Sequence, residues 1–155
     1  PSSVHAPGRA ARRALNDARE RIAAFFRVAP DAVIFTSGGT EALALALDGA
    51  EATQRLVGAT EHIAVLAAAP HAEIIPIDQQ GRAQLPPILQ GALVALQQAN
   101  NETGVVQDLA AIAQTVHAAG ARLLADCVQS AGKLPLPPAD FIALSAHKLG
   151  GPAGI

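Results

Sequence analysis

Apolar residues along this chain follow two patterns that alternate from one end to the other. Short unbroken apolar runs are typical of strands buried on both faces of a sheet. Between these runs, apolar residues recur every three or four positions, as they do on one face of a helix. The runs predict strands over residues 32–36, 55–57, 73–77, 92–96, 122–125 and 141–144, and the helical spacing predicts helices over 8–27, 41–47, 61–68 and 109–119.

This alternation predicts an α/β fold, a mainly parallel sheet with helices on both faces. Gly120 directly follows the last predicted helix, in the position where glycine commonly ends a helix. Proline-rich stretches at 86–87 and 135–138 interrupt the pattern only as loops. The length of 155 residues and the absence of an internal repeat predict a single domain.

Small or polar residues stand at four places where the chain leaves a predicted strand. In an open parallel sheet the ligand site lies beyond the carboxyl ends of the strands, so these segments are expected to share one edge. They are Ser37-Gly38-Gly39-Thr40, Asn100-Asn101-Glu102, Asp126-Cys127-Val128-Gln129 and Ser145-Ala146-His147-Lys148.

Composition and charge exclude several classes of function. The formal net charge is -2, and the early arginines alternate with Asp17 and Glu20 as on a solvated helix face, so no nucleic-acid partner is expected. No apolar run approaches the ~20 residues of a membrane span, so no membrane partner is expected. The single cysteine, Cys127, excludes an internal disulfide and suits a reducing cytoplasm.

Familiar nucleotide, zinc and esterase motifs do not occur. The chain has no G-x-G-x-x-G, and Gly132-Lys133 lacks the neighbours that a phosphate loop requires. The histidines and Cys127 lack zinc-ligand spacing, so no metal is expected, and G-x-S-x-G is missing. The strand ends offer instead a Gly-rich turn, an acid and a lysine.

These three features together match what pyridoxal phosphate requires. The backbone N–H groups of residues 37–40 and the Thr40 hydroxyl can hold a phosphate. Asp126 can pair with a protonated ring nitrogen, and Lys148 can form a Schiff base. Taken singly, each has a plainer interpretation as a helix cap, a turn residue or a solvated lysine. Their shared placement at strand ends favours the cofactor site.

Four stretches of the chain carry a family resemblance. They are FTSGGTEALALAL, TEHIAVL, QANNETGVVQDLAAIAQTVHAAGARLLADCVQSAGKLPL and ALSAHKLGGPAGI. In this order they resemble the cysteine desulfurases, which are fold-type I pyridoxal-phosphate enzymes of the class V aminotransferase group. The resemblance covers almost the whole chain, and it implies that residues 1–155 are part of the large cofactor-binding domain of such an enzyme.

The resemblance also implies a role for each matching residue. Lys148 would bind the cofactor as a Schiff base and move protons at the substrate α-carbon, and His62 would stack on the ring and help in proton transfer. Asp126 would keep the ring nitrogen protonated, and Gln129 would bond the ring hydroxyl. The remaining residues would hold the phosphate (Gly39, Thr40, Ser145 and His147) or lie near the cofactor and the substrate carboxylate (Asn101).

The activity implied by the resemblance is conversion of L-cysteine to L-alanine, with persulfide sulfur passed on for iron–sulfur cluster assembly. The expected partners are a second copy of the chain, which completes the phosphate site, and a sulfur-acceptor or scaffold protein. Alternatives are another class V lyase, such as a selenocysteine lyase or a kynureninase-like enzyme, and a non-catalytic scaffold relative. Intact Asp126, Gln129, His62 and Lys148 argue against the scaffold.

Three features depart from the family pattern. Ala146 stands where the family usually has glycine, and the spacing from Thr40 to Asn101 is shorter than usual. Cys127 does not match the nucleophilic cysteine, which in the family lies beyond the position of Ile155, as does the arginine that binds the substrate carboxylate. Because the chain also lacks methionine and begins at Pro1, we expect an internal piece of a longer protein that is inactive by itself.

Overall fold

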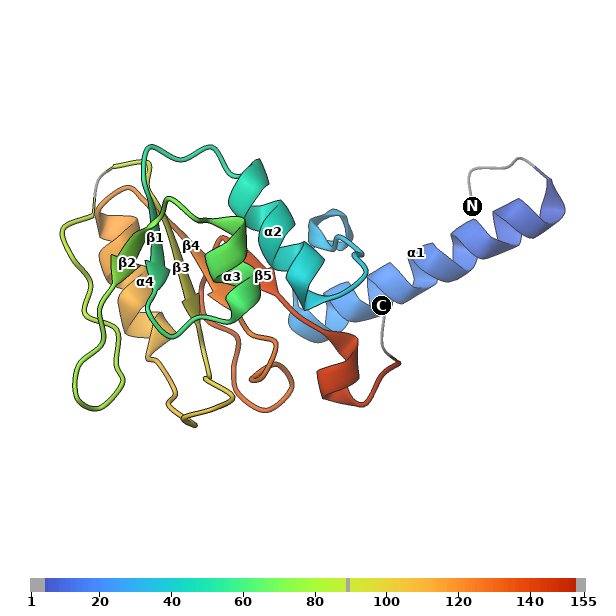
Figure 1. Cartoon of the computed structure of the whole chain (residues 1–155). Helices are drawn as coiled ribbons and strands as arrows, with labels where there is room; N and C mark the ends of the chain where they lie inside the picture. The colour runs from blue at the N-terminus through green and yellow to red at the C-terminus, as the bar shows by residue number, and fades with distance from the viewer. Residues whose placement is uncertain (1–4, 89, 153–155) are drawn as a thin grey trace. The chain divides into compact units, whose positions relative to one another are not determined.

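A computed structural model describes residues 5–88 and 90–152. They form two compact units, one that ends at Phe35 and one that begins at Thr36 (Figure 1). None of the helices within these ranges combines the length and the apolar character needed to cross a membrane.

The first unit contains one long helix, α1, from Ala6 to Phe26. It begins where the His5 ring accepts a hydrogen bond from the Gly8 N–H, and it ends at Arg27, which adopts a left-handed conformation with φ 57°. The helix predicted over 8–27 is therefore confirmed. A short 3₁₀ turn, η1, follows at Pro30–Ala32.

The strand predicted over 32–36 is wrong. Ala32 closes η1, and residues 33–36 have an irregular backbone. The Val33 N–H bonds back to the Pro30 carbonyl, and the Val33 carbonyl accepts a bond from Arg19 Nε at 3.2 Å. A β-branched, aromatic run forms a strand only beside another strand, and no described strand pairs with it.

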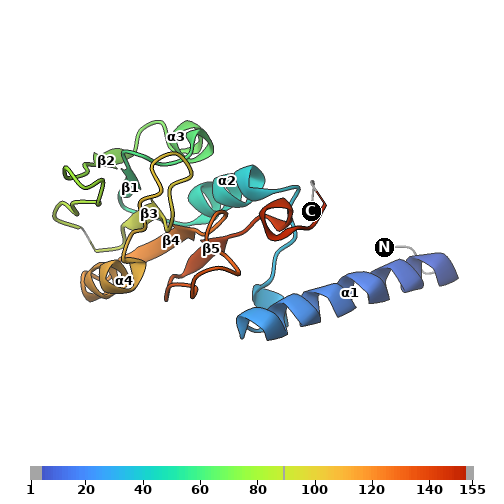
Figure 2. The ribbon, with the colours of Figure 1, turned by 90° about the horizontal axis from the view of Figure 1, so that it is seen from below.

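The second unit is built on a five-stranded sheet in which all neighbouring strands are parallel. The strand order β2-β1-β3-β4-β5 places β3 in the middle and leaves β2 and β5 at the two edges (Figure 2). This confirms the predicted parallel α/β fold. The strands are β1 (Arg55–Gly58), β2 (Glu73–Ile75), β3 (Leu93–Gln97), β4 (Arg122–Asp126) and β5 (Phe141–Ala143).

Helices cover both faces of this sheet, as predicted. Helices α2 (Gly39–Gly49) and α3 (Ile63–Ala68) lie on one face, and α4 (Leu109–Ala118) lies on the other (Figures 1 and 2). Alternate residues of each strand point to opposite faces, so a strand buried on both sides is apolar throughout. In β3, Leu93 and Ala95 pack with α2 and α3, whereas Val94 and Leu96 pack with α4.

Several element boundaries differ by one or two residues from the sequence prediction, and two of these differences have a clear local cause. Strand β2 ends at Ile75 because Pro76 has no N–H to donate, and Ile77 instead forms an isolated antiparallel bridge with Ala83. The helix predicted over 61–68 begins only at Ile63, because the chain makes a turn after β1 in which the Glu61 N–H bonds the Gly58 carbonyl.

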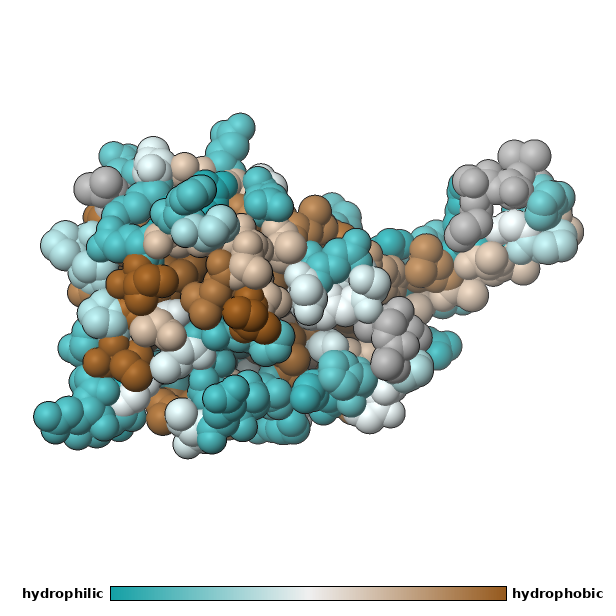
Figure 3. All heavy atoms as spheres, viewed as in Figure 1, coloured by the Kyte–Doolittle hydropathy of each residue, from teal (hydrophilic) through white to brown (hydrophobic). Residues whose placement is uncertain are grey.

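Apolar side chains are exposed on the face of the second unit that carries α3 and β2 (Figure 3). Ile63 of α3 and Ile74 of β2 are both more than half exposed. Exposed apolar surface of this kind favours contact with further protein.

Candidate functional site

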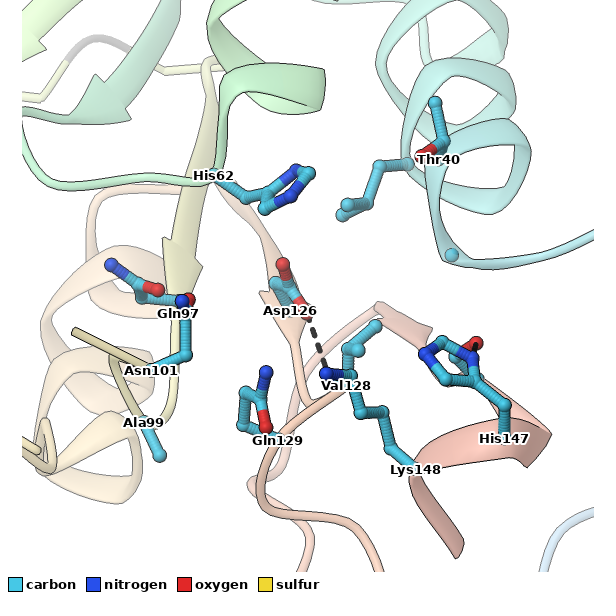
Figure 4. Close-up of a pocket in the computed structure, with 13 residues that line it drawn as sticks. Thr40, His62, Gln97, Ala99, Asn101, Asp126, Val128, Gln129, His147 and Lys148 are labelled. Atoms are coloured by element: carbon cyan, nitrogen blue, oxygen red, sulfur yellow. Dashed lines mark hydrogen bonds between the residues drawn. The ribbon is translucent and has the colours of Figure 1, made fainter. Parts of the chain in front are cut away.

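A cavity of about 250 Å³ lies at the carboxyl edge of the sheet, between the exits of β1, β3, β4 and β5 and the first turn of α2 (Figure 4). Every site residue predicted from the sequence lines it. Four further residues, which the sequence did not indicate as site residues, also line it: Leu43, Gln97, Ala99 and Val128. The predicted set is Gly39, Thr40, His62, Asn101, Asp126, Gln129, Ser145, His147 and Lys148.

One end of the cavity, where α2 begins beside Ser145 and His147, is suited to an anion and is called the anion seat below. Helix α2 begins there at Gly39, and the first N–H groups of a helix have no partners within the helix. A Cβ on Gly39 would lie 2.9 Å from Val128 Cγ2 and 3.7 Å from the Ser145 Cβ, so glycine allows α2 to approach the β4 and β5 exits closely. Ser145 Oγ and His147 Nδ1 share a 2.8 Å hydrogen bond beside it.

The centre of the cavity contains a buried carboxyl group. Asp126 is the last residue of β4 and is 8 % exposed, and its Oδ1 accepts a 2.9 Å bond from the Val128 N–H. Burial raises the pKa of Asp126, while the Val128 bond and His62 act in the opposite direction. No lysine or arginine of the described chain pairs with this carboxyl, so it can accept a cationic group from a ligand.

His62 and Lys148 approach the cavity from different elements. His62 caps the start of α3, where its Nδ1 accepts a 3.1 Å bond from the Ala64 N–H, so the free nitrogen of the ring is Nε2. Lys148 lies in a 3₁₀ turn, η2 (Ala146–Leu149), directly after β5. In Figure 4, Asp126 lies between His62 and Gln129, and Lys148 lies on the Gln129 side.

Ala146 fits into η2 without backbone strain. Its φ is negative, and its carbonyl accepts a 2.9 Å bond from the Gly151 N–H. Gly150, at φ 85°, turns the chain away after Leu149, a conformation that favours glycine. The alanine found at this position therefore leaves Lys148 at the cavity.

The loop after β1 is fastened to the end of β3 by side-chain hydrogen bonds. The Thr60 carbonyl accepts bonds from Gln97 Nε2 and, at 3.0 Å, from Asn100 Nδ2. Asn100 Oδ1 also accepts the N–H groups of Glu102 and Thr103, so Asn100 shapes its own turn while Asn101 faces the cavity. These bonds hold the segment that carries His62.

Glu61 is a buried acid that the sequence pattern did not indicate. It is 7 % exposed, its Oε1 accepts a 2.9 Å bond from the Gln97 N–H, and its Oε2 has no partner. The pKa of Glu61 is raised to about 8, mainly by burial and to a smaller extent by the nearby Asp126, while the Gln97 bond acts in the opposite direction. Its position directly before His62 is typical of an ordinary helix start, so the sequence did not indicate that Glu61 is buried.

Comparison with known proteins agrees with this geometry. The model of the family described as aminotransferase class-V matches residues 1–155. The chain belongs to this family. Among its relatives, a cysteine desulfurase of Cereibacter sphaeroides is 41 % identical, over 100 % of this chain and 46 % of the relative. The resemblance to the cysteine desulfurases is thus confirmed.

Solved structures of other proteins share the fold of this class-V chain. A NifS-like protein from Rickettsia africae matches with a TM-score of 0.88 and 29 % identity, over 99 % of this chain and 48 % of that protein. A structure described as SspA in complex with cysteine has a TM-score of 0.88 and 25 % identity, over 99 % of this chain and 51 % of SspA. The chain spans about half the length of the relatives it matches.

Proposed function

We propose that this chain is the pyridoxal-phosphate-binding part of a cysteine desulfurase. The observation that carries the proposal is the convergence of an anion seat, a buried carboxyl and a lysine on one cavity, in a chain whose relatives are named cysteine desulfurases. Residues 1–155 would then form part of the large domain, and the rest of the longer protein would supply the small domain.

The residues of the cavity fit this cofactor. The start of α2 with Thr40, Ser145 and His147 would hold the phosphate, because helix N–H groups and short polar side chains bind phosphate oxygens. Asp126 has no cationic partner in the described chain, and this suits a carboxylate that pairs with a protonated ring nitrogen. When bound, the cofactor supplies an electron sink for the substrate α-carbon.

Each side chain then has a defined task. Lys148 would carry the covalent link to the cofactor and move a proton at the substrate α-carbon. Asp126 would hold the proton on the ring nitrogen. His62 would cover the ring from the β1 side, and Gln129 would bond the ring hydroxyl from the β4 side. Asn101 would lie near the substrate carboxylate.

The proposed reaction converts L-cysteine to L-alanine. The carbon–sulfur bond of the substrate breaks, its sulfur forms a sulfur–sulfur bond with a protein thiol, and the thiol proton replaces the sulfur on carbon. The SspA structure described as a complex with cysteine supports this class of substrate. We further propose a cytoplasmic homodimer that passes its persulfide to a sulfur-acceptor or scaffold protein for iron–sulfur cluster assembly.

The direct test uses the full-length protein loaded with pyridoxal phosphate. We expect it to release equal amounts of alanine and sulfide from L-cysteine under reducing conditions, above the background of free cofactor. L-selenocysteine and L-kynurenine, assayed in parallel, separate the other class V lyases. Turnover of either compound with L-cysteine inert would assign the protein to that lyase instead, and inertness toward all three would support a scaffold role.

Cys127 is expected to take no part in the sulfur chemistry. It is fully buried, it does not line the cavity, and burial raises its pKa to about 12, whereas a nucleophilic thiol needs exposure and a low pKa. We expect Cys127→Ala to retain desulfurase turnover and to lose about 1 kcal/mol of unfolding free energy. Mass spectrometry during turnover should find no persulfide on Cys127, and finding one there would contradict this assignment.

A further inference from the structure

Glu61 has no role in the proposed reaction, yet the fold leaves space for its buried carboxyl group. A Cβ on Gly58 would lie 2.6 Å from Glu61 Oε1, so the glycine at the end of β1 leaves room for this carboxyl group in its observed position. Glu61 is not among the residues that line the cavity, and its Oε1 accepts a hydrogen bond from the N–H of Gln97, the last residue of β3. The carboxyl therefore joins the β1 exit to the β3 exit.

This carboxyl lies close to the centre of the site. Gln97, which it bonds, is paired in register with Asp126 on the neighbouring strand. Among the described residues, Asp126 of β4 is the charged group that acts on Glu61, and His62, next in the chain, acts on Asp126. β1 and β3 place Gly58 and the side chain of Leu96 beside it, and neither carries a charge.

Two carboxylates so close together in a buried place would repel each other, and neither is paired with a lysine or arginine of the described chain. The unpartnered Oε2 of Glu61 adds to this cost, since a buried ionised oxygen without a hydrogen bond is expensive. A proton on Glu61 removes the repulsion, and it makes the unpartnered oxygen part of a neutral group, whose burial costs less than that of a charge. The raised pKa of Glu61 agrees with this argument from geometry.

We propose that Glu61 is a positioning residue that remains protonated in the working protein. As a neutral acid it fastens the His62 loop to the end of β3, and it leaves Asp126 as the charged member of the pair. The inference rests on the proposed function for its purpose, because a protonated ring nitrogen needs one carboxylate beside it. The protonation itself does not depend on the reaction.

The proton is tested first, in the full-length protein without cofactor. Infrared spectroscopy at neutral pH should show the carbonyl stretch of a protonated carboxylic acid, which Glu61→Gln removes and the exposed matched control Glu51→Gln retains. The band should disappear as the pH rises through about 8. A spectrum in which Glu61→Gln removes no such band would overturn the proposal, whatever the enzyme's activity.

The positioning role is tested by comparing Glu61→Ala with Glu61→Gln. Glutamine keeps a neutral acceptor for the Gln97 N–H, and alanine removes it. We expect Glu61→Ala to show faster hydrogen exchange in peptides that contain the Gln97 amide, and a kcat that is lower by about ten-fold or more. Glu61→Gln should restore most of the protection from exchange and most of kcat. Equal hydrogen exchange and equal kcat in the two variants would reject the positioning role. The proposed function is tested separately, by the loss of cofactor binding in Lys148→Ala.

Discussion

Lys148→Ala is expected to abolish the visible absorption of bound cofactor in the full-length protein and to lower turnover of L-cysteine by about 10²–10⁴-fold from the lost proton transfer alone. The reason is that η2 presents Lys148 to the cavity beside the anion seat formed by Ser145 and His147. Alanine removes the amine without disturbing the turn, whose end is fixed by Gly150. Absorption spectra and single-turnover kinetics measure the two effects.

The matched control is Lys133→Ala. Lys133 is the other lysine of this chain, and its Nζ donates a 2.9 Å hydrogen bond to the Gln129 carbonyl at an exposed position. We expect Lys133→Ala to keep the absorption spectrum and the turnover. If the spectrum disappears in Lys133→Ala and survives in Lys148→Ala, the assignment of the lysine is reversed.

Asp126→Asn is expected to separate cofactor binding from catalysis. Asparagine keeps an acceptor for the Val128 N–H but cannot supply the charge that holds a proton on the ring nitrogen. We expect cofactor content to remain close to that of the unmodified protein, and turnover to fall on the order of 10²–10³-fold, as when one preorganised electrostatic partner is lost. Unchanged turnover with a full complement of cofactor would contradict the role of Asp126.

The stability of the Asp126 variant gives an independent check. Because burial raises the pKa of Asp126, the folded protein without cofactor holds this proton more tightly than the unfolded chain does. The resulting contribution to the unfolding free energy is lost as the pH rises through the raised pKa. Asp126→Asn should remove this dependence and leave stability at neutral pH unchanged or higher. Asp140→Asn, which removes the negative charge 2.9 Å from His117 Nε2, should lower stability without changing turnover.

Much of the fold follows from local sequence. The central strands are buried on both faces, so their apolar runs reveal them without any knowledge of their neighbours, as in β3 and β4. The segment 33–36 has the same kind of apolar run but lacks a paired strand in the described chain. Its composition therefore predicted a strand that does not form. In β2, one proline shortened the strand.

The candidate site was predictable to a similar extent. Residues after β4 and β5 could be identified because parallel strands present their carboxyl ends at one edge. Gly39 and Thr40 also line the cavity, but as the start of α2, because the strand predicted before them does not form. Glu61 could not be identified in this way. Its burial depends on the missing side chain of Gly58 and on an N–H of β3, two features of tertiary structure that its place in the sequence does not show.

The most direct test of the central claim is to locate the cofactor on the chain. The full-length protein loaded with pyridoxal phosphate is reduced with borohydride and digested, and the modified peptide is identified by mass spectrometry. We predict a single reduced pyridoxyl group on Lys148. Modification of another lysine, or no modification in a protein that nevertheless turns over L-cysteine, would contradict the proposal that this cavity holds the cofactor through Lys148.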